Sequence, residues 1–385
     1  MAAEAITGDR TFFAPRFVIR VGEREVGPPF IRDVLDVTFE DSLDALEFFE
    51  FTLHDWDPVR NAPKYSSPYD ESGARVRVDD ADVPAFEPGM KAELQLGYYG
   101  PEEPVTKLVG TIVSLEPSFP ESGIPQMKVR VVSDLFAFEK EQVTREFADK
   151  TDTAVAQALA DDLGARLETA AGQADKETPN EFLMLNNEYP IDFLMRRARY
   201  LGYDLYALPR SEDPALFFGP SGDETPTYAL SWGRTLTRFD IAVRIRDQVS
   251  KVDVLATNPV KAGGDRDILA TKTLKDLDLD LPDSKLLDTI TGSLVKTHTV
   301  VDQPVQNQAE ADVRALGILR EKIKDLITAQ GGTIGFPHLR AGNPVEITGV
   351  GPRYSGIWTL TKTTHRIDGT GYRTTFSARL EGPLP

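Results

Sequence analysis

Short segments in which apolar and polar side chains alternate recur toward both ends of the chain, and they restrict its possible folds more than any other feature. Early examples are 16–21, 48–53 and 107–115. A two-residue period is typical of β-strands that bury one face. Further segments of this kind are 91–97, 127–132, 241–255, 295–301, 345–348, 357–366 and 372–380. The pattern predicts an α+β, mostly β protein built on antiparallel sheets, and the turn Asp368–Gly371 predicts a terminal hairpin.

Three segments carry the three- and four-residue spacing of amphipathic helices. They are 153–163, with Thr151 or Thr153 as N-cap, 190–201, which starts at Pro190 and ends before Gly202, and 308–329, which Gly331 and Gly332 are expected to end. The last is the longest periodic pattern in the chain.

The order of these elements predicts three domains. Residues 1–140 are expected to form an antiparallel β-barrel or sandwich with a turn-rich excursion at 58–88. Residues 141–224 are expected to form a small helical α+β piece. Residues 225–385 are expected to form a second β domain, which contains a surface insertion at 258–285 and the helix 308–329.

Composition excludes several classes of function. The 385 residues include 43 Lys and Arg against 61 Asp and Glu, a formal net charge of −18, and no cysteine. The acidic surplus argues against a nucleic-acid partner. The lack of cysteine excludes thiol nucleophiles, disulfides and cysteine-based metal sites. The start of the chain does not resemble a secretory signal, and no uncharged apolar stretch approaches the ~20 residues that span a bilayer. We therefore expect a soluble protein made in the cytoplasm.

The four histidines do not suggest a catalytic or metal site, because none lies within metal-ligand spacing of another. His54 precedes Asp55, which is one arrangement of a catalytic base and an orienting carboxylate. A strand that ends in a turn, with Trp56 packed over it, is the favoured interpretation. His365 lies in a predicted strand, and there too a structural role is favoured.

Other catalytic motifs are absent or incomplete. No Gly-x-Ser-x-Gly elbow and no phosphate-binding loop occurs. Gly349-Val350-Gly351 begins like a dinucleotide fingerprint, but Tyr354 takes the place of the third glycine and a strand is expected to follow. An acidic run resembles a calcium loop, but leucines alternate with its members and no glycine supplies the turn: Asp276, Asp278, Asp280 and Asp283. We predict no catalytic, cofactor-binding or metal-ligating residue. A carboxylate pair for glycan cleavage stays open, because spacing in sequence does not give separation in space.

Charge is segregated along the chain. Residues 33–59 contain nine carboxylates and no Lys or Arg: Asp33, Asp36, Glu40, Asp41, Asp44, Glu47, Glu50, Asp55 and Asp57. Two groups of arginines contrast with this acidic block: Arg196, Arg197 and Arg199, and Arg234, Arg238, Arg244 and Arg246. Either subunit contacts or solvated faces would explain the pattern. If the acidic block faces a basic neighbour, reversing Glu47 and Glu50 to Lys should weaken assembly.

Several motifs, taken in order, resemble those of the phage late control D family, the tail hub proteins of contractile phages and phage-like injection systems. The N-terminal hub part of type VI secretion VgrG proteins is a relative. The matching segments are Phe48–Leu53, Gly89–Leu96, Leu108–Val113, Tyr189–Arg197 with Gly202-Tyr203, Ala341–Val345, Tyr354–Trp358, His365 and Gly371–Phe376. The resemblance as a whole spans about residues 15–380. The segment 258–285 has no counterpart that we can assign.

The resemblance implies a homotrimer in which each chain supplies two tail-tube-like β-barrels, from about 10–140 and 225–385. Six barrels would then match a hexameric tube on one side and a trimeric spike on the other. The partners implied are the tail tube or tube-initiator protein, baseplate wedge proteins and a spike. The spike is expected to be a separate polypeptide, because the chain stops after the last hub strand.

The function we predict is a structural, non-enzymatic baseplate hub of a contractile tail or injection particle. It would be made in the bacterial cytoplasm, with no cofactor, no nucleic-acid partner and no stable membrane insertion before contraction. Two alternatives remain open. One is a peptidoglycan- or glycan-cleaving tail enzyme that uses a carboxylate pair, and the other is an effector or binding module carried on the particle.

Overall fold

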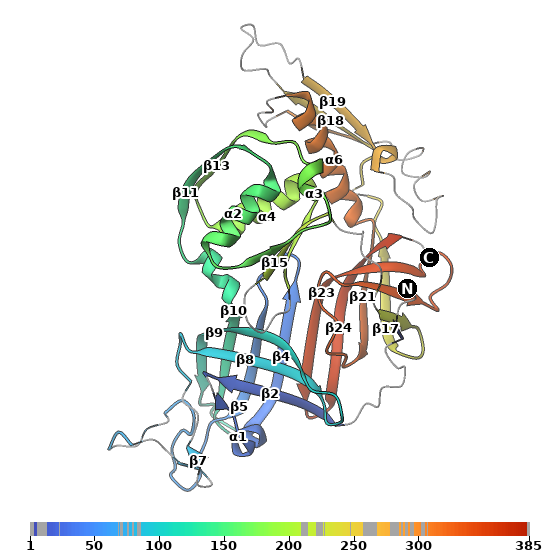
Figure 1. The fold of residues 1–385 in the computed structure, drawn as a ribbon. Coiled ribbons are helices and arrows are strands. Elements are labelled where there is room, and N and C mark those ends of the chain that lie inside the picture. The colour runs from blue at the N-terminus through green and yellow to red at the C-terminus, as the bar shows by residue number, and fades with distance from the viewer. Residues whose placement is uncertain are drawn as a thin grey trace.

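A computed structural model of the chain shows a large curled sheet with a smaller group of helices and strands above its N-terminal part (Figure 1). The structure describes residues 4–5, 14–22, 24–67, 69, 72–74, 77–78, 81–82, 86–208, 215–220, 226, 228–246, 248–256, 268–277, 285, 288, 292, 296–301, 305 and 307–382. All structural statements below concern these residues.

Fourteen strands form the large sheet. They are β1 (Glu4–Ala5), β2 (Pro15–Val21), β3 (Arg24–Glu25), β4 (Val34–Ser42), β5 (Phe48–His54), β8 (Lys91–Tyr98), β9 (Val105–Ser118), β10 (Gln126–Ser133), β16 (Tyr228–Ser231), β17 (Leu236–Val243), β21 (Ile327–Ile334), β22 (Pro344–Thr348), β23 (Gly356–Asp368) and β24 (Gly371–Gly382). Neighbouring strands are antiparallel, except that β16 runs parallel to β1 and β22. The predicted mostly β fold is confirmed.

The two-residue period places the expected side chains in the interior. In β5, Phe49, Phe51 and Leu53 are fully buried, while the residues between them are partly exposed. Every second residue of β24 from Tyr372 to Leu380 is buried. The β23–β24 loop contains only Gly369 and Thr370, which makes it shorter than the sequence pattern suggested.

The middle of the chain forms a compact α+β group. Its elements are β11 (Val143–Lys150), α2 (Asp152–Asp162), β12 (Arg166–Glu168), α3 (Gln173–Lys176), β13 (Asn180–Glu188), α4 (Pro190–Leu201), β14 (Asp204–Leu208) and β15 (Ala215–Gly219). The predicted N-cap is confirmed, because the Thr151 side chain accepts from the Ala154 N–H. So are the start of α4 at Pro190 and its end at Gly202, which adopts φ 73°.

The remaining elements are short, apart from one long helix. They are α1 (Pro28–Asp33), β6 (Arg77–Val78), β7 (Ala81–Asp82), η1 (Asp134–Glu139), β18 (Lys251–Ala256), β19 (Ile268–Thr273), η2 (Leu274–Leu277), β20 (Thr297–Val300) and α6 (Gln308–Lys324). The predicted strand 241–255 is interrupted, because β17 ends at Val243 and β18 begins only at Lys251.

The helix predicted over 308–329 is too long at its C-terminal end. Helix α6 ends at Lys324, and β21 begins at Ile327. Leu326, Ile327 and Ala329 are all buried, and their spacing fits a helix as well as a strand. Pairing with β17 and β24 decides in favour of the strand. Gly331 and Gly332 therefore lie within β21 and do not end the helix.

Six strands near each end of the chain follow the same order in the sheet. We call β2, β8, β9, β10, β5 and β4 the first β unit, and β16, β22, β23, β24, β21 and β17 the second β unit. The order of strands along the chain is the same in both units. The registers also agree, since Phe51 faces Val129 where Gly331 faces Phe376. The chain therefore contains an internal structural repeat.

The two β units join edge to edge through one pair of strands, which we call the seam. The C-terminal half of β23 pairs with β4, from Lys362 opposite Ser42 to Asp368 opposite Asp36. Side chains cross the seam as well, because Ile367 and Tyr372 are buried in the core of the first β unit. The seam makes one continuous sheet of the two units.

Three clusters of buried side chains form the cores. The first lies in the first β unit, the second lies in the second β unit with α6, β18 and β19, and the third lies among the middle elements. The limits of the three predicted domains stay predictions.

Parts of both predicted irregular segments belong to these cores. In the excursion 58–88, Tyr65 and Phe86 are buried against Phe30. In the insertion 258–285, Ala270 and Leu274 are buried in the core of the second β unit. These two residues anchor the described part of the insertion to the core, while Thr271, Lys275, Asp276 and Lys285 are exposed. Residues 258–267 and 278–284 lie outside the described residues, and the surface insertion stays a prediction.

We expect Gly331→Ala to destabilise the protein by about 1–3 kcal/mol, because overpacking a core forces side chains out of place. A Cβ at Gly331 would lie 2.2 Å from the Phe376 ring. Gly332→Ala is the matched control, since its Cβ would meet nothing closer than 3.5 Å. Urea unfolding measures both. Equal midpoints for the two variants would contradict this account of the repeat.

Candidate functional site

A buried ionic network lies at the seam. The Arg340 guanidinium donates to Asp41 Oδ2 from Nε at 2.6 Å, to Glu47 from Nη2, and to the Lys107 carbonyl oxygen at 2.6 Å. Asp41 also accepts from the Ala341 N–H at 3.1 Å and from the Thr363 hydroxyl. Because these groups come from both β units, the network fixes how the units meet. All its charged side chains are at most 6% exposed.

Lys107 and His365 extend this network into the core. Lys107 Nζ donates to the carbonyl oxygens of Pro337 (2.7 Å) and Leu339 (3.2 Å), and it lies 4.9 Å from the centre of the Phe39 ring. His365 Nε2 is 2.9 Å from the Leu339 carbonyl oxygen. That nitrogen therefore carries the proton, and Nδ1 accepts from the Tyr372 hydroxyl at 2.8 Å.

Burial shifts the pKa values of these groups. It raises the pKa of Glu47, although Arg340 opposes the shift. It lowers the pKa of Lys107 far below its usual value, and the Arg340 charge adds to this. His365 likewise has a pKa well below 6.5, because of burial and then the nearby Lys107. The cluster is enclosed, so these shifts reflect packing and do not mark a site that a substrate could enter.

The acidic block 33–59 finds its partners within the chain. The pairs are Asp33 with Lys64, Asp36 with Arg366, Glu40 with Lys362, Asp41 and Glu47 with Arg340, Asp44 with Arg199, Glu50 with Lys128 and Arg130, and Asp55 and Asp57 with backbone N–H groups of the loop that follows β5. A subunit-facing role is therefore wrong for Asp41 and Glu47, which are buried inside one chain.

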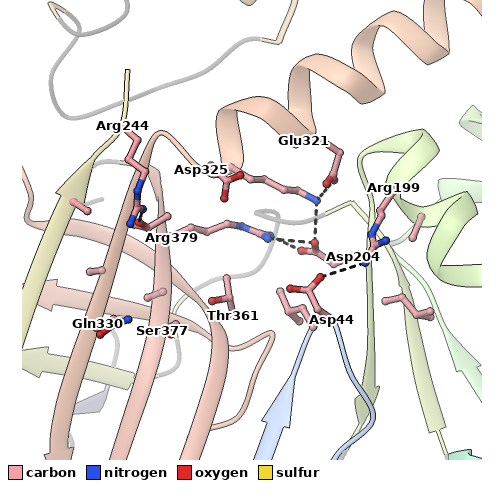
Figure 2. Close-up of a pocket in the computed structure, with 18 of the residues that line it drawn as sticks. Asp44, Arg199, Asp204, Arg244, Glu321, Asp325, Gln330, Thr361, Ser377 and Arg379 are labelled. Carbon is pink, nitrogen blue, oxygen red and sulfur yellow. Dashed lines mark hydrogen bonds and ion pairs between the residues drawn. The ribbon is translucent and has the colours of Figure 1, made fainter. Parts of the chain in front are cut away.

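An open polar cleft of about 570 Å³ lies where the middle elements meet α6 and the second β unit (Figure 2). In this cleft, the carboxylate of Asp204 at the start of β14 is paired with two cations. Lys324 Nζ lies 3.0 Å from Asp204 Oδ1, and Arg379 makes two hydrogen bonds to the same carboxylate. At the mouth, Arg199 lies 4.0 Å from Asp44.

The pKa of Asp204 lies below its usual value. Burial alone would raise the pKa, but the charges and hydrogen bonds of Arg379 and Lys324 outweigh this effect. The carboxylate is therefore ionised and committed to two cations. The cleft thus ties three parts of the chain together: β14, α6 and β24. The charges of Asp204, Lys324 and Arg379 in the cleft are paired with one another.

The structure places His365 in the seam network and His54 at the end of β5. His54 ends β5, and Asp55 next to it accepts from the N–H groups of Lys64, Tyr65 and Ser66. Asp55 therefore holds a loop and does not orient the imidazole. The strand that ends in a turn is confirmed, while the packing of Trp56 over it stays a prediction. His365 is buried and hydrogen-bonded within the seam network, in line with the structural role favoured for it.

The other candidate motifs stay apart or belong to turns. Asp276 accepts from the N–H and the hydroxyl of Thr273, while Asp278, Asp280 and Asp283 lie outside the described residues. Gly349-Val350-Gly351 connects β22 to β23, so a strand follows it as expected. Among the described residues, no group of three His, Asp or Glu side chains could hold a metal ion.

Sequence analysis missed the residues that matter most at the seam. Lys107 has the appearance of a charge at an exposed strand end, and Arg340 lies in a loop. Their partners are 293–299 residues away for the Arg340 ion pairs, and 230–258 residues away for Lys107. The one available signal was the number of carboxylates in 33–59 without a local cation.

Solved structures with the same fold are tail-type proteins. A 43 kDa tail protein of prophage MuSo2 from Shewanella oneidensis is 14% identical, with a TM-score of 0.66 and coverage of 96% of this chain and 99% of the other. A tail protein from Neisseria meningitidis MC58 is 15% identical, with a TM-score of 0.66 and coverage of 97% and 98%.

A third similar structure comes from a secretion system. It is an E. coli component of the type VI secretion system that exhibits structural similarity to bacteriophage T4 tail proteins. It is 10% identical, with a TM-score of 0.55 and coverage of 95% of this chain and 77% of the other. At these identities the likeness shows the fold, which is that of phage tail and type VI secretion proteins.

A family model described as the Alg8 N-terminal domain matches residues 69–369, well over half of the sequence. The chain therefore belongs to the Alg8 N-terminal domain family, whose description names no activity. No curated protein matches the sequence. No helix among the described residues is long and apolar enough to cross a membrane.

We expect Glu47→Lys to destabilise the fold by about 3–5 kcal/mol, because it leaves Arg340 buried beside a second cation. Glu50→Lys is the matched control. Its carboxylate is more exposed, and the pairs with Lys128 and Arg130 at 3.4 and 3.9 Å are each worth at most about 1 kcal/mol. Denaturant unfolding of both variants is the measurement. A Glu47→Lys protein as stable as Glu50→Lys would show that the network does not hold the seam.

Acid should weaken the fold through His365. In the unfolded chain this imidazole gains a proton near its ordinary pKa of 6.5, whereas in the folded chain its pKa is well below that value. The unfolded state therefore binds more protons below pH 6.5, and stability falls as the pH falls. We expect a loss on the order of 1 kcal/mol by pH 5.5 relative to pH 7.5.

His365→Gln should remove that part of the pH dependence, whatever its effect on stability at pH 7.5. His298→Gln serves as the control, because His298 is exposed in β20. Urea midpoints at the two pH values give the difference for each protein. An unchanged pH dependence in His365→Gln would contradict the assignment of a neutral buried imidazole.

Proposed function

We propose that this protein is the structural hub of a contractile tail or a phage-like injection particle. In this role it forms a homotrimer that joins a hexameric tail tube to a trimeric spike. The observation that carries the proposal is the internal repeat, two β units of the same strand order joined at a seam. Three such chains present six similar units to a sixfold tube while keeping threefold symmetry for a spike.

The tail-type fold of the similar structures supports this role, and so does the resemblance to the late control D family. Tube or tube-initiator, wedge and spike proteins are the partners we propose. The particle is a virion tail, or an injection device made in the bacterial cytoplasm.

A non-enzymatic role follows from the same proposal. The charged groups described above are enclosed at the seam or paired across the cleft, and they serve to hold parts of the chain together. A hub adapts symmetry and carries load through large interfaces, for which no reacting group is needed.

The test is a gentle pull-down of the tagged chain from its native host, analysed by mass spectrometry and negative-stain microscopy. We expect tube, sheath and spike proteins in rod-shaped particles with three copies of the chain. The untagged strain is the control for carry-over. Deleting the gene should stop particle assembly, and a plasmid copy should restore it. Normal particles without the chain would refute the proposal.

A further inference from the structure

One continuous run of eight strands crosses both β units, in the order β17, β21, β24, β23, β4, β5, β10 and β9. At one end, β17 pairs with β21 alone among the described strands. At the other, β9 pairs with β8 only up to Thr111, and residues 113–118 have β10 on one side alone. Figure 1 places β17 at the right of the sheet and β9 at the left. Six strands separate these two edges within one chain.

The seam shows what such edges do when they meet. Strand β23 corresponds to β9 in the repeat, and β4 corresponds to β17. In the second β unit, β22 pairs with β23 only up to Thr359, and the C-terminal half of β23 is covered by β4. Among the described strands, none covers the matching half of β9 in the first β unit. In the second β unit, β17 matches β4, and it pairs with no described strand besides β21. The chain thus contains one filled seam and the two halves of a second.

Register shifts allow the halves to be matched residue by residue. The β4–β5 register shifts between Val34 and Asp36, and the β17–β21 register shifts between Leu236 and Arg238. The β9–β10 and β23–β24 registers also shift at equivalent places, where Ser114 matches Lys362. Counting from these points, Thr38 corresponds to Asp240 and Arg366 to Ser118. Because Thr38 faces Arg366 in the seam, Asp240 should face Ser118.

Exposed apolar side chains lie where the filled seam has buried ones. Ile367 and Tyr372, at the tip of the β23–β24 hairpin, are buried in the core of the first β unit. The equivalent of Ile367 is Phe119, which is 57% exposed at the tip of the β9–β10 hairpin. Ile124, one residue from the equivalent of Tyr372, is 52% exposed. An apolar side chain as exposed as that of Phe119, at a position that is buried in the repeat, indicates a missing partner.

We propose that the β9–β10 hairpin of one copy adds to the β17 edge of a second copy, with Phe119 packed beside Phe239 and Ser118 opposite Asp240. The partner at the β17 edge is a second copy of this chain, because β9–β10 matches the β23–β24 hairpin of the filled seam in register, in bulge position and in its apolar tip. The contact joins two different surfaces, so copies associate head to tail and can close into a ring. This inference deepens the proposed hub and rests on it for the number of copies.

Pro117 affects how the second seam is held. Proline has no N–H to donate, so the backbone ladder at this edge is weaker than that between β4 and β23. The apolar tip must then supply more of the contact. This arrangement also suits an edge that has to stay single until its partner copy arrives, because proline on an edge hinders pairing with unrelated strands.

Cysteine cross-linking tests the register directly, since the chain has no cysteine of its own. Directly opposed residues in antiparallel strands have Cα atoms about 4.5–5.5 Å apart, which suits a disulfide. We expect an equimolar mixture of Asp240→Cys and Ser118→Cys proteins to form a covalent two-copy species under mild oxidation. Neither variant alone should do so, because the contact is head to tail.

Two controls accompany this experiment. The double variant Thr38→Cys/Arg366→Cys sits at the same register of the filled seam, and it should form its disulfide within one chain. Val59→Cys is 93% exposed elsewhere on the surface, and its mixture with Asp240→Cys should give no cross-link beyond collisional background. The absence of a 118–240 cross-link, where the intrachain control closes, would overturn the proposed contact.

The outcomes separate this inference from the proposed function. Native mass spectrometry of the unaltered chain reports ring formation by itself. Three-copy rings without the 118–240 cross-link would overturn the proposed contact and would remain consistent with the proposed hub function. A 118–240 cross-link in a chain that never enters tail-type particles would uphold the contact and refute the hub.

A second variant tests the apolar tip. Phe119→Asp should weaken association of the copies at least about tenfold, because it places a charge in a contact that must exclude water. Val59→Asp is the control, with a similar change at another exposed position, and should leave association unchanged. Sedimentation velocity over a concentration series measures both. Equal association constants for the two variants would show that the tip is not in the interface.

Discussion

The pairing of β4 with β23 is the interaction on which the rest of the structure depends. It turns two separate β units into one sheet, and it places Ile367 and Tyr372 in a core to which neither β23 nor β24 otherwise belongs. Backbone pairing alone does not choose between registers, and a slip by one residue would turn every side chain to the wrong face. Arg340 selects one register, because it can pair with both of its carboxylate partners, Asp41 and Glu47, in only one arrangement of the two strands.

Equivalent strands of the two β units pair in the same register, but the side chains at equivalent positions differ. Where the first β unit has Phe51 opposite Val129, the second has Gly331 opposite Phe376, so the bulky ring has moved to the neighbouring strand. The second pair is also smaller, because glycine stands where the first pair has a residue with a side chain. Differences of this kind hide the repeat in the sequence, although the two units share their strand order and two register shifts. The units differ at one edge, where β2 and β8 are antiparallel and β16 and β22 are parallel.

Local patterns predicted most of the strands and the helices α2 and α4, because the period and the caps of each element lie within a few residues of it. The end of α6 could not be predicted, since Leu326, Ile327 and Ala329 satisfy both periods and only β17 and β24 decide between them. The seam network was out of reach for a related reason. Lys107 and Arg340 are held by groups more than 200 residues away, and nothing near them in sequence announces a buried cation.

The network also explains how two similar seams can coexist in one assembly. The positions equivalent to Asp41, Glu47 and Thr363 are Val243, Ile327 and Leu115, which are apolar. If β4 of one copy paired with β9 of another, Asp41 would be buried opposite Leu115 with no Arg340 to neutralise it. Such a pairing would cost several kcal/mol. The polar seam therefore closes within a chain, and the apolar one is left for a second copy. Specificity here arises from the penalty on the wrong pairing more than from the strength of the right one.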